Sequence, residues 1–101
     1  MALVKVGSLA EIPVGSVVEA SVGDKPFALV NAGGEIHVLD GVCPHRQGPL
    51  GQGALDGHLL VCPWHAWEFD CRTGESDYHP EIKVKKYAVS MVGDDIFIDT
   101  P

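Results

Sequence analysis

Two short segments of the chain each place a cysteine close to a histidine: Cys43-Pro-His45 and Cys62-Pro-Trp-His65. Sixteen residues lie between His45 and Cys62, in a glycine-rich stretch. Each segment offers one thiolate and one imidazole. If the two segments face each other, two sulfur and two nitrogen donors meet at one point, which is a donor set for zinc or an iron–sulfur centre.

Three interpretations of this pattern compete. The four side chains could be buried cysteines and hydrogen-bonded histidines with structural roles, but structural thiols have no reason to pair with imidazoles at short, fixed spacing. They could bind structural zinc, although zinc sites usually pair cysteine with cysteine and histidine with histidine along the chain. The third interpretation is a 2Fe–2S cluster with two cysteines on one iron and two histidines on the other. The mixed order of ligand types favours this cluster.

Length and composition predict one folded domain. The 101 residues leave room for a single domain, 1–101, and 46% of them are hydrophobic, which is typical of a globular chain. No apolar stretch approaches the roughly 20 residues that cross a bilayer. The N-terminus lacks the charged region and apolar core of a secretory signal. We therefore expect a cytoplasmic protein without a membrane anchor.

Charge and cysteine count narrow the classes of partner. Fourteen acidic residues against seven basic ones give a formal charge of −7. This balance argues against nucleic acid, whose binding requires lysine and arginine to displace counterions. It permits docking on a basic face of another protein, although the same charge also simply favours solubility. Three cysteines in a chain without a secretory signal point to metal binding or free thiols and not to a disulfide framework.

Alternation of apolar and polar residues dominates the chain. Glycine-containing turns at 23–26 and 32–34 predict two hairpins in the first forty residues. The capping-box spacing of Ser8 and Glu11 predicts one turn of helix. No stretch keeps a 3.6-residue apolar period over three turns, so we expect a small all-β fold of antiparallel sheets. The expected strands are Val17–Val22, Phe27–Asn31, Glu35–Leu39, His58–Val61, Ala66–Asp70, Ile82–Val89 and Ile96–Asp99, with a long loop over 41–57.

Over about residues 38–75 the sequence resembles the cluster-binding region of Rieske-type ferredoxins and Rieske oxygenases. The resemblance rests on C-P-H-R-Q-G-P-L at 43–50, G-H-L-L-V-C-P-W-H-A-W-E-F-D at 57–70 and T-G-E at 73–75. It implies a Rieske-type fold of three stacked antiparallel sheets, with two cluster-binding loops at one tip. The cluster-binding subdomain would cover about residues 41–80.

The resemblance also implies one 2Fe–2S cluster bound by Cys43, His45, Cys62 and His65. The cysteines would hold the inner iron, and the histidines the outer iron, where the electron leaves. Two ferric ions, two sulfides and two thiolates sum to zero charge, whereas four thiolates would leave −2. Histidine ligation therefore raises the reduction potential.

Comparison with respiratory Rieske proteins predicts a potential at the low end of the Rieske range. Those proteins join their two loops by a disulfide, and the corresponding positions here are Gly48 and Trp64. They also place a serine and a tyrosine hydroxyl near the cluster sulfurs, where this chain has Trp67 and Phe69. Because hydrogen bonds to the sulfurs tune the potential, we expect a value of about −150 mV.

Other candidate residues have simpler expected roles. Cys71 lies outside the ligand spacing and is expected to be a structural or free thiol. His37 is expected at the surface or half-buried in a strand. Trp64 and Trp67 are expected to pack over the cluster and keep water from it. Roles beside the cluster stay open for Arg46 and His79.

A single 2Fe–2S cluster holds one electron at a time, so the resemblance implies an electron carrier and not an enzyme. A Rieske-type ferredoxin takes electrons from a flavin-containing reductase and delivers them to a terminal Rieske oxygenase. The alternative is the Rieske-like small subunit of a larger reductase, such as assimilatory nitrite reductase. The catalytic subunit of an oxygenase needs a further iron site of two histidines and a carboxylate in a second domain. A chain of 101 residues has no room for that domain.

Overall fold

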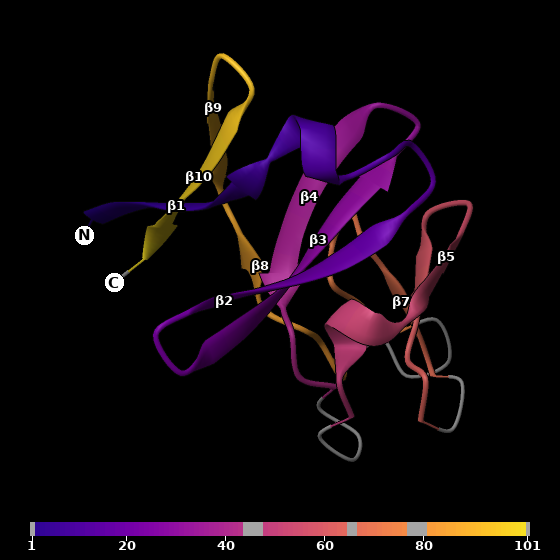
Figure 1. The fold of residues 1–101 in the computed structure, drawn as a ribbon. Helices are drawn as coiled ribbons and strands as arrows, with labels where there is room; N and C mark the ends of the chain where they lie inside the picture. The colour runs from indigo at the N-terminus through magenta and orange to yellow at the C-terminus, as the bar shows by residue number, and fades with distance from the viewer. Residues whose placement is uncertain (1, 44–47, 65–66, 77–80, 101) are drawn as a thin grey trace.

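The computed structural model describes residues 2–43, 48–64, 67–76 and 81–100. These residues form three antiparallel sheets, with strand orders β1-β10-β9, β2-β3-β4-β8 and β5-β6-β7 (Figure 1). This confirms the expected all-β fold of three sheets. The strands are β1 (Ala2–Ser8), β2 (Val17–Val22), β3 (Lys25–Ala32), β4 (Glu35–Asp40), β5 (Ala54–Asp56), β6 (Leu59–Val61), β7 (Glu68–Asp70), β8 (Lys86–Tyr87), β9 (Val89–Val92) and β10 (Asp95–Thr100), and two single 3₁₀ turns are η1 (Leu9–Glu11) and η2 (Leu50–Gln52).

The central sheet contains the two predicted hairpins. Two residues, Gly23 and Asp24, separate β2 from β3, and Gly33 and Gly34 separate β3 from β4. Gly23, Gly33 and Gly34 all have positive φ, at 62°, 63° and 97°, a conformation that glycine adopts without steric cost. Each connection is a turn of two residues, so β3 begins at Lys25, inside the region expected to form the turn. The predicted helical turn is also present, as a 3₁₀ turn in which the Ser8 amide donates to Glu11 Oε1 at 3.1 Å.

Two expectations about secondary structure were wrong. Residues 50–56 are not part of a long loop, since they form η2 and β5. Residues 82–89 do not form one strand, because β8 has two residues that pair with β4, whereas Val89 pairs with Ile98 of β10. The chain therefore passes from the central sheet to the β1-β10-β9 sheet around Ala88. Alternation predicts which side chains are buried, but it does not say which sheet a strand joins.

The central sheet is covered on both faces. Six consecutive residues of β3 are buried, which is typical of a strand packed on two sides. One face packs against the β1-β10-β9 sheet in a cluster of Val6, Ile12, Phe27, Leu29, Val38, Tyr87, Ile96 and Ile98. The opposite face packs in a cluster of Ala28, Val30, Ala32, Leu39, Cys43, Leu50, Leu60, Cys62, Phe69, Cys71 and Val84. The second cluster contains all three cysteines, so their surroundings lie between the central sheet and the β5-β6-β7 sheet.

The two ends of the chain lie side by side, away from the third sheet. Ala2 pairs with Thr100 at the ends of β1 and β10. Figure 1 shows both termini on the side of the molecule opposite β5. The cysteine-containing part is therefore remote from the termini.

His37 is buried, in contrast to the expected surface or half-buried position. It lies opposite Val30, on the face of β4 that carries Leu39 and turns toward the third sheet. Its side chain is 7% exposed, and its Nε2 lies 2.8 Å from Glu35 Oε1 without being aligned to donate a hydrogen bond. Burial lowers the pKa of His37, and the neighbouring Lys86 and His58 lower it further, while Glu35 opposes them.

This burial predicts a loss of stability on mild acidification. An unfolded histidine takes up its proton near pH 6.5, whereas folded His37 resists protonation until a lower pH. The unfolded state therefore binds more protons as the pH falls below 6.5, and the free energy of unfolding declines over that window. We expect the urea midpoint of the cluster-loaded protein to fall between pH 7.5 and pH 5.5. In His37→Phe the decline should be smaller, and an equal decline in the two proteins would contradict this account.

Candidate functional site

The loop that begins at Cys43 is fixed at its base to the central sheet. The Gly41 amide donates to the Pro26 carbonyl of β3 at 3.0 Å, and the Leu50 amide donates to the Gly41 carbonyl at 2.9 Å. A β-carbon on Gly41 would lie 2.8 Å from the Pro26 carbonyl carbon, so only glycine permits this approach of the two backbones. Strand β4 ends at Asp40, and Cys43 follows three residues later at a position that these contacts fix.

A network of side chains, which the sequence analysis missed, holds the end of β4. Tyr87 Oη donates to Asp40 Oδ1 at 2.6 Å, and Lys25 Nζ lies 3.5 Å from the same oxygen. The Tyr87 ring meets Phe27 edge-on at 5.2 Å between centroids. Burial and the bond to Asp40 raise the pKa of Tyr87, so the phenol stays protonated and remains a donor. These contacts join residues far apart in sequence, and no local motif marks them.

The two cysteine loops are closed in the same way. Cys62 directly follows β6, and its amide donates to the Trp67 carbonyl at 2.7 Å. The Cys43 amide donates to the Gly48 carbonyl at 2.9 Å. In each loop the cysteine N–H thus binds the carbonyl five positions later. The predicted ligands His45 and His65 belong to these two loops but lie outside the described residues.

The structure brings the two cysteine thiols together in one buried place. Cys43 is fully buried and Cys62 is 1% exposed, although they follow strands of different sheets. Burial raises the pKa of Cys62, a hydrogen bond from the Trp64 backbone lowers it, and the adjacent Cys43 thiol raises it again. The two sulfurs are therefore neighbours, as the predicted pairing of the loops requires.

This pair suits the thiolate half of an iron–sulfur site. A bound iron would take the place of the two thiol protons, and its two bonds to sulfur would offset the cost of burying two thiolates. A Rieske centre takes two thiolates on one iron and two imidazoles on the other. Within the described ranges, no group of three or more histidine, cysteine or acidic residues could hold a metal ion. Of the four predicted ligands, the two cysteines lie in those ranges and the two histidines, His45 and His65, lie outside them.

Cys71 is buried in the same core but forms no disulfide, like the other two cysteines. Its amide donates to the His58 carbonyl at 2.9 Å, and burial raises the pKa of its thiol. These features agree with the expected structural thiol.

The two tryptophans have different surroundings. Trp67 is partly buried against the cysteine-containing core, with its ring 6.3 Å from that of Phe69. Trp64 is 50% exposed and lies against Gly48 of the other loop. Both tryptophans are expected over the cluster from the sequence, but the contact of Trp64 with Gly48 has no sequence signal.

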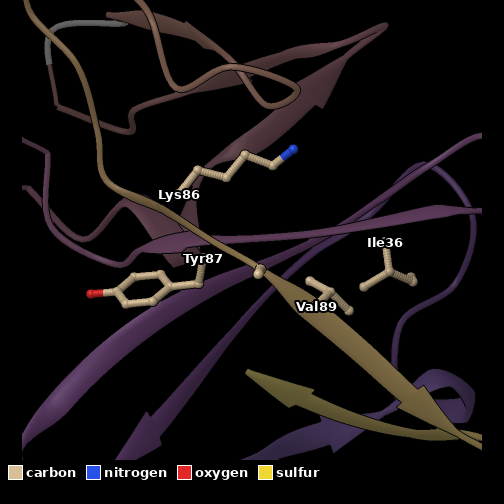
Figure 2. Close-up of a pocket in the computed structure, with 5 residues that line it drawn as sticks. Ile36, Lys86, Tyr87 and Val89 are labelled. Atoms are coloured by element: carbon tan, nitrogen blue, oxygen red, sulfur yellow. The ribbon is translucent and has the colours of Figure 1, made fainter. Parts of the chain in front are cut away.

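A shallow depression lies along β8 and the start of β9, apart from the cysteine loops. Its volume is about 290 Å³, and it is lined by Ile36, Lys86, Tyr87, Ala88 and Val89. Figure 2 shows Ile36 and Val89 side by side there, and the Lys86 side chain separate from them. Small-molecule sites combine an apolar pocket with several converging polar groups. Polar groups do not converge in this depression, because the Tyr87 hydroxyl already donates its hydrogen bond to Asp40.

None of the described helical segments is long and apolar enough to cross a membrane.

Comparison with known proteins assigns the family. Residues 2–88 match the Rieske 2Fe–2S domain. The ferredoxin component of a naphthalene 1,2-dioxygenase system from Pseudomonas aeruginosa is 36% identical over 93 residues, which cover 91% of this chain and 89% of that protein. The ferredoxin of Sphingomonas yanoikuyae B1 has a similar structure, with a TM-score of 0.90, 29% identity and coverage of 99% and 100% of the two chains.

A putative nitrite reductase small subunit shares the fold, with a TM-score of 0.81 at 12% identity over 99% of this chain and all of that one. At that identity the likeness concerns the fold alone. The family match and the full-length relatives say more about function, because they associate this fold with a 2Fe–2S cluster and with the role of an electron carrier. The chain therefore belongs to the Rieske 2Fe–2S family, as an electron-carrying ferredoxin with one 2Fe–2S cluster of the kind found in dioxygenase systems.

Proposed function

We propose that this ferredoxin works in the cytoplasm, where it takes single electrons from a flavin-containing reductase and passes them to a terminal Rieske oxygenase. The full-length similarity to ferredoxin components of naphthalene and biphenyl dioxygenase systems supports these partners. The observation that carries the proposal is the pair of buried thiols, Cys43 and Cys62, held by two matching loops. A buried pair of thiols of this kind is suited to hold a redox centre.

We further propose Cys43, His45, Cys62 and His65 as the ligands, with the cysteines on the inner iron. When bound, the cluster supplies a single electron at a time. The chain acts as one domain, 1–101, in which about residues 41–80 bind the cluster. The third sheet and both cysteine loops fall within that range, which supports this division.

The chain's own residues perform three tasks in this function. The closed loops and their apolar surroundings exclude water from the thiolates. The Asp40–Tyr87 bond fixes the strand from which Cys43 departs. Val42 and Trp64 are 39% and 50% exposed and lie next to proposed ligands in sequence, so each offers some apolar surface to a partner. The net charge of −7 favours a partner with a basic face.

The three cysteines allow a matched test of the ligand set. We expect Cys43→Ser and Cys62→Ser to abolish the visible absorption and electron paramagnetic resonance signal of the cluster, because a serine hydroxyl is a poor substitute for thiolate on iron. Cys71→Ser, a change of the same size in the same core, should keep both signals. Loss of the cluster in Cys71→Ser, or its retention in either of the other variants, would overturn the assignment.

The reduction potential tests the surroundings of the cluster. Trp67 and Phe69 offer no hydroxyl to the cluster sulfurs, so we expect a midpoint of about −150 mV in an optically monitored redox titration. A midpoint well above zero would contradict this view of the site. In Phe69→Tyr, a hydroxyl that reaches a sulfur should raise the midpoint by stabilising the reduced form.

Electron delivery tests the function itself. The protein is reduced with one equivalent of dithionite and mixed with the oxidised oxygenase of a naphthalene dioxygenase system in a stopped-flow instrument. We expect reoxidation at a rate that rises with oxygenase concentration and falls with added salt, since exposed charges are screened. If the oxygenase does not reoxidise the reduced protein, and the protein copurifies from its host with a large reductase, the alternative of a nitrite-reductase-type small subunit is supported.

A further inference from the structure

Gly48 lies directly beneath the side chain of Trp64. A β-carbon added to Gly48 would lie 2.9 Å from Cγ, 3.0 Å from Cβ and 3.0 Å from Cδ2 of Trp64, and these are its nearest neighbours. The position is closed to a larger residue because the tryptophan occupies the space.

This contact joins the two cysteine loops. Gly48 belongs to the first loop, where its carbonyl accepts the hydrogen bond from the Cys43 amide. Trp64 belongs to the second loop, two positions after Cys62, whose amide donates to the Trp67 carbonyl and closes that loop. The contact thus joins a residue that is hydrogen-bonded to Cys43 with a residue two positions from Cys62. All three cysteines of the chain are free, so no disulfide joins the loops.

The exposure of the two residues indicates a contact that packs one loop on the other. Gly48 is buried, whereas half of the Trp64 surface still faces solvent. An indole that served only as a surface side chain would leave Gly48 free to be any small residue. Trp64 instead covers the first loop with one part of its side chain and leaves the rest exposed.

We propose that Trp64 is a positioning residue. Its packing on Gly48 holds the two cysteine loops together and slows the loss of the cluster. Without this contact the loops can part, which opens the thiolates to water and to competing ligands. The proposal rests on the presence of the cluster and not on the identity of the redox partners. Its test therefore needs no partner protein and stays separate from the test of electron delivery.

The test is a double-mutant cycle on the purified, cluster-loaded protein. The variants are Gly48→Ala, Trp64→Ala and their combination, and the measurement is the rate of bleaching of the visible absorption in the presence of a ferrous chelator. Gly48→Ala should accelerate cluster loss on the order of fivefold to tenfold, because its methyl group displaces the indole. Trp64→Ala should have a similar effect. The double variant should be no faster than Trp64→Ala, since no indole remains for the methyl group to strike.

Two further variants keep the test decisive. Trp64→Phe keeps an aromatic ring over Gly48 and should lose the cluster more slowly than Trp64→Ala. Val92→Ala removes apolar surface from an exposed side chain on the β1-β10-β9 sheet, which carries neither cysteine loop, and should leave the rate of cluster loss unchanged. If Gly48→Ala accumulates no loaded protein, adding Trp64→Ala should restore loading. An unchanged rate in Gly48→Ala, or effects that multiply in the double variant, would overturn the proposal.

Discussion

Two thiols from separate loops must share one buried place, and most of this small structure serves that constraint. Cys43 follows the central sheet and Cys62 follows a strand of the third sheet, so the two sheets must keep a fixed distance. Close packing between them sets the distance, and the Asp40–Tyr87 bond fixes the exit point of the first loop. Neither sheet could position the pair alone.

The third sheet gains most from this arrangement. Each of its strands has three residues, and a sheet of such short strands has little stability of its own. It is held through Leu60 and Phe69, which pack into the cysteine-containing core. A bound cluster would add covalent bonds between this sheet and the central one, so folding of the third sheet and binding of the cluster are coupled.

Local chemistry explains which parts were predictable from sequence. The hairpins follow from glycine-containing turns such as Gly33-Gly34, and the paired loops follow from the cysteine and histidine spacing, because both signals lie within a few residues. The burial of His37, the change of sheet around Ala88 and the Gly48–Trp64 contact were not predicted. Each depends on which distant segment packs against the residue, and a pattern along one strand does not carry that information.

The position of Trp64 connects the stability of the site with its use. A carrier must bind two partners in turn and release each one, which favours a small apolar contact surrounded by charge over a large dry interface. The exposed half of Trp64 can supply such a contact, while its other side rests on Gly48. A partner that covers this indole would remove its exposed half from water while its other side stays on Gly48, so one side chain could serve both the joining of the loops and the contact with a partner.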